Sequence, residues 1–268
     1  MKKFGTFTAT GPSRIILALV NIGFGRGRLK RLFAQTWNRL NSNQPLDLLY
    51  HGLMFRLHPQ QNTIESKMIF SSKRREETEL NIINHYLTDD SVFLDIGANI
   101  GYYALNVARL GAQKVIAIEP NPVIAARLNS NIALNNLWSK IAVHEVAVGA
   151  KKGVAKLTIS DSDLGSSSIV DHSVGERHIS VPIIPLLEIL QTEGVVMADI
   201  VKIDIEGMED RVLFPYFEAI EPAYYPRLIV MEDGINSQWE RDILSWLLVN
   251  GYHVATRTRG NVVLVKAA

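Results

Sequence analysis

Two apolar segments that each end in a carboxylate restrict the fold of this chain more than any other feature. Residues 92–94 are apolar, Asp95 follows them, and a turn containing Gly97 and Gly101 comes next. Residues 115–118 are again apolar and end at Glu119. A strand, a glycine turn, a helix and a second strand with a terminal acid about twenty residues later are the layout of a nucleoside-binding α/β unit. The sequence therefore predicts an α/β fold.

The rest of the chain continues the alternation of strands and helices. Further strands are expected over residues 141–148, 198–205 and 227–231, an extra pair over 156–159 and 179–184, and short strands within 45–70. Helices are expected over residues 75–87 and 100–110, from Pro122 with Asn121 as its cap, and from a Ser237/Glu240 capping box through Leu248. A hairpin of residues 252–255 and 262–265 is expected to close the chain.

The first glycine turn predicts a cofactor site. Glycines leave backbone N–H groups at the start of a helix open to a ligand, because they carry no Cβ. Nicotinamide dinucleotide sites place three glycines here, whereas this chain has Asp95 at the first position. A carboxylate repels a pyrophosphate and attracts a cation, so we expect S-adenosylmethionine, which carries a sulfonium and an ammonium group. The predicted cofactor-binding residues are Asp95, Gly97, Asn99, Gly101, Tyr102, Glu119 (to the ribose hydroxyls) and Asn121.

A second group of charged residues lies at the end of the strand expected at 198–205. The side-chain period of two in a strand puts Lys202, Asp204 and Glu206 on one side. Buried charges are costly unless they are paired or bind a ligand. We expect these residues to act on an acceptor, the second substrate that reacts with the cofactor. Asp204 is expected to act as base or to orient the acceptor, and Glu206 to bind or support it. Lys202 is expected to keep both carboxylates ionised. A purely structural ion-pair network is the alternative, and Glu209 is expected to be structural at the next helix start.

Several motifs resemble those of one enzyme family. They are residues 94–102, 119–122, 147–149, 165–167 and, most specifically, 201–209. Over roughly residues 75–235 the chain is similar to the FkbM-type family of S-adenosylmethionine-dependent methyltransferases. The resemblance implies a class I, Rossmann-like sheet of seven strands, mostly parallel with a C-terminal antiparallel hairpin. It also implies methyl transfer to a hydroxyl of a glycan, glycolipid or related metabolite, an in-line displacement aided by positioning and a general base.

Other candidate ligands for a metal or a proton have simpler interpretations. Glu232 and Asp233 follow the strand at 227–231, and with Asp204 they are an alternative magnesium site, although we expect no metal. The histidines are expected to be structural or solvated: His144 in the core or at a sheet edge, and His172 and His178 in a loop.

Charge is distributed unevenly along the chain. Residues 1–46 contain eight Lys or Arg and no Asp or Glu, whereas the remainder carries 20 basic and 27 acidic residues. The acidic main part argues against nucleic acid as a partner. Leu29, Leu32, Phe33, Trp37 and Leu40 recur at helical spacing opposite basic residues. This amphipathic helix either packs on the main domain or docks on an anionic membrane surface.

The chain is expected to comprise a basic helical extension over residues 1–44 and a catalytic domain over 45–268. Residues 15–25 are too short and too interrupted to span a bilayer, and no signal peptide is expected. The absence of cysteine fits a reducing compartment, so we expect a cytoplasmic protein, with or without contact to a membrane. The alternatives in function are a non-catalytic cofactor-binding or membrane-tethering module and a nicotinamide-dependent oxidoreductase.

Overall fold

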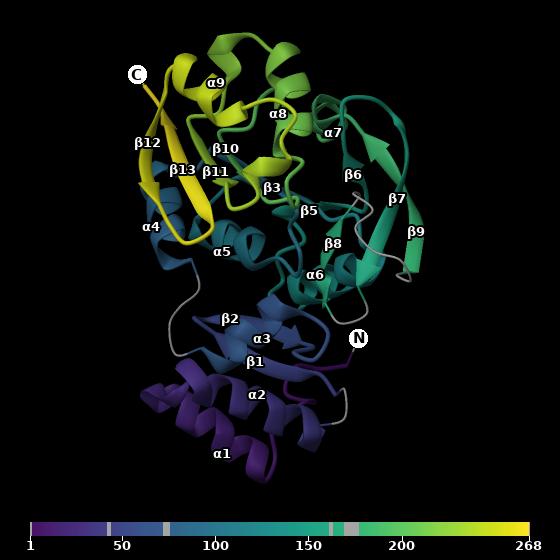
Figure 1. Cartoon of the computed structure of the whole chain (residues 1–268), viewed down its shortest axis with the longest axis vertical. Coiled ribbons are helices and arrows are strands. Elements are labelled where there is room, and N and C mark those ends of the chain that lie inside the picture. The colour runs from purple at the N-terminus through teal and green to yellow at the C-terminus, as the bar shows by residue number, and fades with distance from the viewer. Residues whose placement is uncertain (1, 42–43, 72–75, 161–162, 169–176, 268) are drawn as a thin grey trace.

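A computed structural model describes residues 2–41, 44–71, 76–160, 163–168 and 177–267, and its centre is a seven-stranded sheet (Figure 1). The strand order is β12-β13-β11-β10-β3-β4-β5. Its strands are β3 (Val92–Ile96), β4 (Lys114–Ile118), β5 (Ile141–His144), β10 (Ile200–Ile203), β11 (Leu228–Glu232), β12 (Tyr252–Arg257) and β13 (Asn261–Lys266). Within this described sheet, β13 pairs antiparallel with both β11 and β12, and the other neighbouring strands pair in parallel. The predicted seven-stranded, mostly parallel sheet with a closing hairpin is confirmed.

Helices cover both faces of this sheet. Phe93 faces a hydrophobic cluster shared with the first layer of helices, and its neighbour Leu94 faces the cluster on the other side. The first layer consists of α4 (Glu77–Tyr86), α5 (Tyr102–Leu110) and α6 (Pro122–Leu134). The second consists of α7 (Leu186–Thr192), α8 (Glu209–Glu218) and α9 (Ile243–Val249). A sheet buried on both faces explains why its strands are continuous apolar runs in the sequence.

Local capping chemistry fixes the position of α6 as the sequence predicts. The Asn121 side chain accepts a hydrogen bond from the backbone N–H of Val123, and Pro122 occupies the first turn. Ile124, Leu128 and Ile132 are fully buried against the sheet. Glu119, the acidic residue before the cap, is thereby held at the carboxyl end of β4.

A second, four-stranded sheet lies between β5 and α7 in the chain. Its order is β6-β9-β7-β8. The strands are β6 (Ala147–Val148), β7 (Gly153–Ser160), β8 (Asp163–Ser168) and β9 (Arg177–Ile184). The two predicted extra strands correspond to β7 and β9, and β8 is a further strand between them in the chain that was not predicted.

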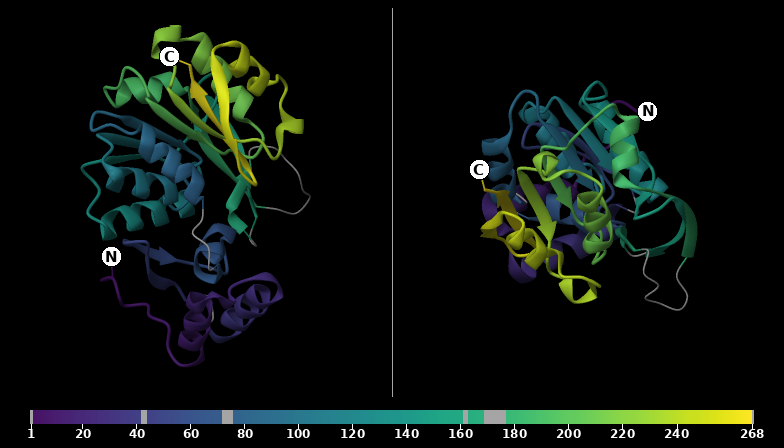
Figure 2. Two further views of the ribbon diagram at one scale, coloured as in Figure 1. Left: turned by 90° about the vertical axis from the view of Figure 1, so that its left-hand side faces the viewer. Right: turned by 90° about the horizontal axis from the view of Figure 1, so that it is seen from above.

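The N-terminal elements pack together at one end of the molecule (Figures 1 and 2). They are α1 (Pro12–Leu19), a π-helical turn η1 (Val20–Phe24), α2 (Gly27–Asn41), the hairpin of β1 (Leu46–Tyr50) and β2 (Leu53–Leu57), and α3 (Thr63–Phe70). Their buried side chains belong to the same hydrophobic cluster as α4, α5 and α6. The boundary predicted between residues 44 and 45 stays a prediction.

Several expected boundaries were wrong. Residues 63–70 form helix α3 rather than a strand, because the Asn62 side chain accepts hydrogen bonds from the N–H groups of Ile64 and Glu65. Ser237 and Glu240 do not cap α9, since Asp242 accepts from the N–H of Ser245. The strand expected at 198–205 ends at Ile203, and the helix expected at 100–110 begins at Tyr102. The helix expected at 75–87 is α4, which runs from Glu77 to Tyr86. Short 3₁₀ turns occupy Pro222–Tyr224 and Asn236–Gln238.

Among the residues that the structure describes, we find no helix with the length and apolar character required to cross a bilayer.

Candidate functional site

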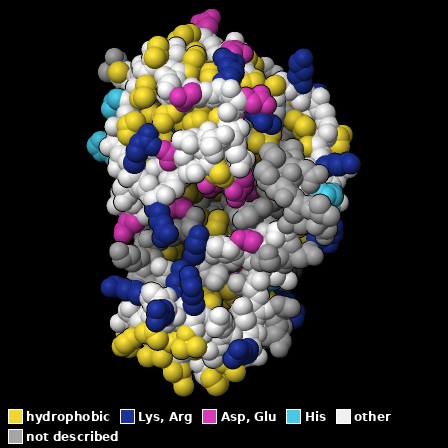
Figure 3. Space-filling view, viewed as in Figure 1, with side chains coloured by type: hydrophobic (Ala, Val, Ile, Leu, Met, Phe, Trp, Pro, Cys, Tyr) yellow, Lys and Arg dark blue, Asp and Glu magenta, His cyan; other side chains and the backbone are white. Residues whose placement is uncertain are grey.

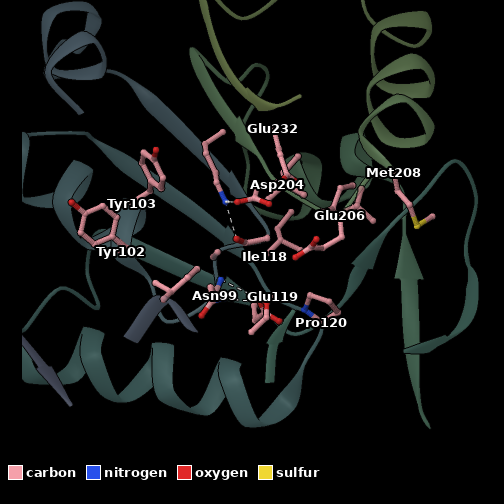
Figure 4. A pocket seen from close by; sticks show the side chains of 18 of the residues that line it. Asn99, Tyr102, Tyr103, Ile118, Glu119, Pro120, Asp204, Glu206, Met208 and Glu232 are labelled. Carbon is pink, nitrogen blue, oxygen red and sulfur yellow. Dashed lines mark hydrogen bonds and ion pairs between the residues drawn. The ribbon is translucent and has the colours of Figure 1, made fainter. Parts of the chain in front are cut away.

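A cavity of about 240 Å³ opens at the carboxyl ends of β3, β4, β10 and β11. In the sheet, β4 and β5 lie on one side of β3, and β10 and β11 lie on the other. The cavity therefore lies at the point where the strand order reverses. Ligands bind at this position in open α/β sheets. Figure 4 places Tyr102 and Tyr103 at one side of the cavity and Met208 and Pro120 at the other.

The floor of the cavity is the glycine turn after β3. Gly97 has φ 75°, and a Cβ there would lie 2.0 Å from the backbone oxygen of Asp204. The N–H groups of Gly97 and Ala98 both donate to the Ile118 carbonyl, at 3.0 and 2.9 Å. Gly97 is therefore required for the close approach of the β3 and β10 ends. Gly101 lies outside the cavity lining and has φ 89°, where a Cβ would meet the side chains of Leu105 and Leu128.

Glu119 is fixed in the cavity wall by backbone hydrogen bonds. Its Oε2 accepts from the N–H of Asn99 and its Oε1 from the N–H of Asn121, both at 2.9 Å. Burial raises the pKa of Glu119 to about 7, and these two hydrogen bonds oppose that rise. Asn99 lines the cavity beside it, whereas the buried Asn121 lies behind the wall and donates from Nδ2 to the Leu164 carbonyl.

Lys202 connects the ends of β3 and β10. Its Nζ donates to the Gly97 carbonyl at 2.9 Å and lies 3.7 Å from Asp95 Oδ1 and 3.6 Å from Asp204 Oδ2. Asp95 is 1% exposed and does not line the cavity, and its Oδ2 accepts from the N–H of Ala104 in α5. Burial raises the pKa of Asp95, and Lys202 opposes the rise. Lys202 and Asp204 line the cavity, so the ammonium lies between a buried carboxylate and an accessible one.

The segment after β10 brings Asp204 and Glu206 together by a turn rather than by strand alternation. β10 ends at Ile203, and Glu206 and Gly207 both adopt positive φ angles of 58° and 88°. Lys202, Asp204 and Glu206 nevertheless all line the cavity, as predicted, although the period-two reason for it was wrong. Glu209 closes this turn from the first residue of α8, where it accepts from the N–H groups of Ile205 and Gly207. Its structural assignment is supported by this geometry.

Glu232, at the end of β11, completes a group of carboxylates with Asp204 and Glu206 (Figure 4). Burial, together with the negative charges of Asp204, Glu206 and Glu209, raises the pKa of Glu232 to about 9. Burial and Asp204 likewise raise the pKa of Glu206. Within the described part of the chain, the buried Oε2 of Glu232 has no hydrogen-bond partner.

The cavity as a whole carries an excess of acidic groups. Its lining includes six Asp or Glu residues and two Lys residues. The acidic ones are Glu76, Glu119, Asp163, Asp204, Glu206 and Glu232, and the basic ones are Lys67 and Lys202. Figure 3 shows Asp and Glu side chains at a hollow near the centre of one face. Neighbouring carboxyl groups in a cleft raise one another's pKa values, and a positively charged ligand stabilises their ionised forms.

One wall of the cavity comes from residues that sequence reasoning did not select. Thr63, Ile64 and Lys67 of α3 line it, and Asn62 donates from Nδ2 to Asn99 Oδ1 at 2.9 Å. The sequence does mark the start of α3, because Asn62 followed by Glu65 three residues later is the pattern of a helix start. Gly165 of β8 also lines the cavity, and its carbonyl accepts from Asn99 Nδ2 at 3.3 Å.

The metal and histidine interpretations can be located in the structure. No group of three His, Asp or Glu side chains among the described residues has the geometry to hold a metal ion. Asp233 pairs with Arg257 instead of facing Asp204. His144 is a half-buried strand residue whose Nε2 lies 2.9 Å from Glu193 Oε1. His178 is exposed on β9, and His172 lies outside the described residues.

Residues 95–254, more than half of the chain, match the family model of the methyltransferase FkbM domain. The chain belongs to the FkbM methyltransferase family. The resemblance read from the residue 94–102 and 201–209 motifs is confirmed, and so, at the level of the family, is the prediction of a methyltransferase. Enzymes of this fold class use S-adenosylmethionine as methyl donor.

Named relatives and one solved structure show how far the similarity extends. The methyltransferase sdnD of Sordaria araneosa is 27% identical over 157 residues, 47% of this FkbM-family chain and 61% of that protein. Methyltransferase 1 of Beauveria bassiana (strain ARSEF 2860) is 26% identical over 151 residues, 47% of this chain and 58% of that protein. The chain thus spans about three fifths of these relatives. The crystal structure of methyltransferase FkbM from Methylobacillus flagellatus KT aligns with a TM-score of 0.46 and 17% identity over 96% of this chain and 58% of that one.

Proposed function

We propose that this chain transfers a methyl group from S-adenosylmethionine to a hydroxyl of a glycan, glycolipid or related metabolite. The observation that carries the proposal is the acidic cavity at the strand ends, where carboxylates outnumber ammonium groups. A pyrophosphate cofactor would be repelled there, so the cavity gives no support to the nicotinamide-dependent alternative.

The residues present fit a cationic adenosyl ligand. Glu119, fixed by two backbone N–H groups, retains lone pairs that can accept from ribose hydroxyls. The carboxyl groups of Asp204, Glu206 and Glu232 offer oxygen atoms to a sulfonium and an ammonium group, and a cation bound there favours their ionised forms. The apolar side chains of Ile118, Val146 and Leu157 supply a surface for a flat base. When bound, S-adenosylmethionine supplies a methyl group that is already activated by the positive sulfur.

Asp204 is the side chain best placed to take the proton of an acceptor hydroxyl. It lines the cavity with its side chain 33% exposed, and Lys202 lies 3.6 Å from its Oδ2. The ion pair with that ammonium holds the Asp204 side chain in the cavity wall, where a carboxylate oxygen can accept a proton from a hydroxyl. Glu206, whose pKa is raised by burial and by Asp204, can hydrogen-bond the acceptor from the same turn. Positioning and one general base of this kind provide the acceleration.

The polar side chains of the cavity wall support a polyhydroxylated acceptor. Thr63, Lys67, Glu76 and Asp163 line the cavity from segments outside the central sheet and can hydrogen-bond a polyhydroxylated molecule. Residues 47–268 carry 20 basic and 27 acidic side chains. A net negative body of this kind gives no support to a nucleic-acid acceptor.

Two substitutions separate the proposed roles. Asp204→Asn is expected to lower turnover by about 10²- to 10⁴-fold with cofactor affinity nearly unchanged, because it removes only the general base. Glu119→Ala is expected to weaken cofactor binding by roughly tenfold or more, because a charge-assisted hydrogen bond contributes about 1.5–3 kcal/mol. Glu221→Gln, at an exposed position remote from the cavity lining, is the matched control.

The acceptor for these assays comes from mass spectrometry of glycans, glycolipids and small metabolites in cells with and without the protein, where a methylated product is sought. Turnover of the purified chain on that acceptor and calorimetric cofactor binding are then measured for each variant. The opposite pattern, with Asp204→Asn losing affinity and Glu119→Ala losing only turnover, contradicts the assigned roles. Tight cofactor binding without turnover on any acceptor class supports the non-catalytic alternative.

A further inference from the structure

The helices at the N-terminal end expose large apolar side chains to solvent. Six of them, on α1, η1 and α2, have exposed fractions between 42% and 71%. They are Ile15, Ile22, Phe24, Leu29, Leu32 and Leu40, which we call the N-terminal apolar face. Figure 3 shows hydrophobic side chains gathered at the end of the molecule formed by α1 and α2. Contiguous apolar surface of this kind marks an interaction site.

This face is not needed to attach the helices to the rest of the chain. α2 is anchored by Trp37, which is 1% exposed and packs edge-on against Phe70 of α3 with ring centroids 5.7 Å apart. α1 is joined to α2 by hydrogen bonds between the side chains of Ser13 and Asn41, at 2.9 and 3.1 Å. Leu29, Leu32 and Leu40 lie on the neighbouring flank of α2 and remain exposed. The helix therefore packs on the body and still presents a second apolar side.

The charges around the N-terminal apolar face are all of one sign. Residues 1–46 contain eight Lys or Arg and no acidic residue. Arg28, Arg31 and Arg39 of α2 are exposed, as is Arg14 of α1. At 100° per residue, Arg28 and Arg39 lie next to the exposed leucines along the helix. A basic helix with an exposed apolar side is complementary to an anionic lipid surface, in which the apolar side chains insert and the guanidinium groups meet lipid phosphates.

We propose that the N-terminal apolar face docks this protein on the surface of an anionic lipid bilayer. The acid-free stretch of 46 residues favours this occupant over a second copy of the chain, because two such faces would bring the exposed arginines of α1 and α2 from both copies together. The proposal goes beyond the methyl transfer proposed above and does not depend on it.

Docking would also fix the position of the cavity relative to the bilayer. Phe70, at the end of α3, contacts α2, while Thr63 and Lys67 of the same helix line the cavity. One short helix thus connects the membrane-facing element with a wall of the candidate site. A protein docked in this way meets acceptors that are displayed at the membrane.

The test is co-sedimentation of the full chain with phosphatidylcholine vesicles that contain or lack phosphatidylglycerol. We expect binding only to the anionic vesicles, and weaker binding at high salt. The variant Ile22→Ser/Leu32→Ser removes two apolar side chains that would insert into the bilayer. The variant Arg28→Gln/Arg31→Gln removes two positive charges, each of which contributes about fivefold to binding near the surface. Each double variant should weaken vesicle binding by roughly tenfold or more. The matched control is Val154→Ser/Val249→Ser, at sites 72% and 86% exposed on other elements.

Circular dichroism and calorimetric cofactor binding show whether each variant is folded, so that a loss of vesicle binding can be assigned to the face itself. The proposal is overturned if the anionic vesicles do not retain the chain. It is equally overturned if the Val154/Val249 control loses as much binding as the Ile22/Leu32 variant. Self-association that disappears in the Ile22/Leu32 variant, with no vesicle binding, would assign the face to a second copy instead.

Discussion

At the scale of single residues, Glu232 links cofactor binding to pH. Burial and the neighbouring carboxylates raise its pKa from 4.5 to about 9, so the side chain is protonated at neutral pH in the free protein. A cationic ligand favours the ionised form, so we expect binding to release the proton. The sign follows directly: cofactor affinity rises with pH over the range in which Glu232 is protonated in the free protein and the ammonium group of the ligand stays charged.

Calorimetry in buffers of different ionisation enthalpy counts these protons. Between pH 6 and 7 the ammonium group of the ligand stays charged, because the usual pKa of an α-amino group is about 7.7–8.0. In this range we expect Glu232→Gln to release about one proton fewer than the native chain. Glu221→Gln should release the native number. Equal proton release by Glu232→Gln and the native chain would show that Glu232 does not titrate on binding.

The chemistry-bearing residues near the central strands could be predicted because they follow apolar runs directly. Asp204 and Glu119 line the cavity for this reason, whereas Glu206 reaches it through the turn after β10. Thr63, Lys67 and Gly165 were not selected, because the sequence can mark a helix start at Asn62 and a motif at Gly165 but not the long-range packing that brings α3 and the small sheet to the cavity. Asp95 was expected to meet a ligand but lies behind the lining, where its carboxylate accepts from the first turn of α5.

At the scale of elements, a buried ion pair holds α3 against α6. Arg127 Nη1 lies 2.8 Å from Glu65 Oε1, and the two side chains are 9% and 0% exposed. Burial raises the pKa of Glu65, and Arg127 opposes that rise. Because α3 supplies a cavity wall, this pair connects stability with the shape of the site. Removing one partner of a buried pair leaves an uncompensated charge.

Arg127→Met is therefore expected to lower the free energy of unfolding by about 3–5 kcal/mol. Adding Glu65→Gln should recover part of the loss, because the unpaired carboxylate is gone. Lys152→Met is the matched control, since its pair with Glu188 is exposed and contributes about 0–1 kcal/mol. Urea unfolding of the four proteins measures these differences. A loss for Arg127→Met no larger than that for Lys152→Met would mean that the pair does not hold α3.

The elements that sequence patterns predicted best are those whose burial is continuous. The core strands β3, β4 and β11 coincide with apolar runs to within a residue or two. α3 was missed because residues 63–70 are too few to show a helical period, so only the Asn62 cap marked the helix. α9 was expected to begin too early, because Ser237 and Glu240 match a capping box that the chain does not use.

At the scale of the whole molecule, the acidic cavity and the basic, apolar N-terminal face occupy different regions of the surface. The cavity at the sheet edge gathers carboxylates, and the N-terminal helices gather basic and apolar side chains. The seven-stranded, mostly parallel sheet with its closing hairpin followed from the alternation of strands and helices and from the family resemblance. How the N-terminal elements pack on the body did not, since their contacts with α4, α5 and α6 join residues far apart in the chain.

The claim that most of this account depends on is that the acidic cavity holds a positively charged adenosyl cofactor. Isothermal titration of the purified chain with S-adenosylmethionine, and in parallel with NAD, tests it directly. We predict saturable binding of S-adenosylmethionine that Glu119→Ala weakens by roughly tenfold or more, and no binding of NAD. Binding of NAD without S-adenosylmethionine, or S-adenosylmethionine affinity that Glu119→Ala leaves unchanged, would contradict the assignment of this cavity.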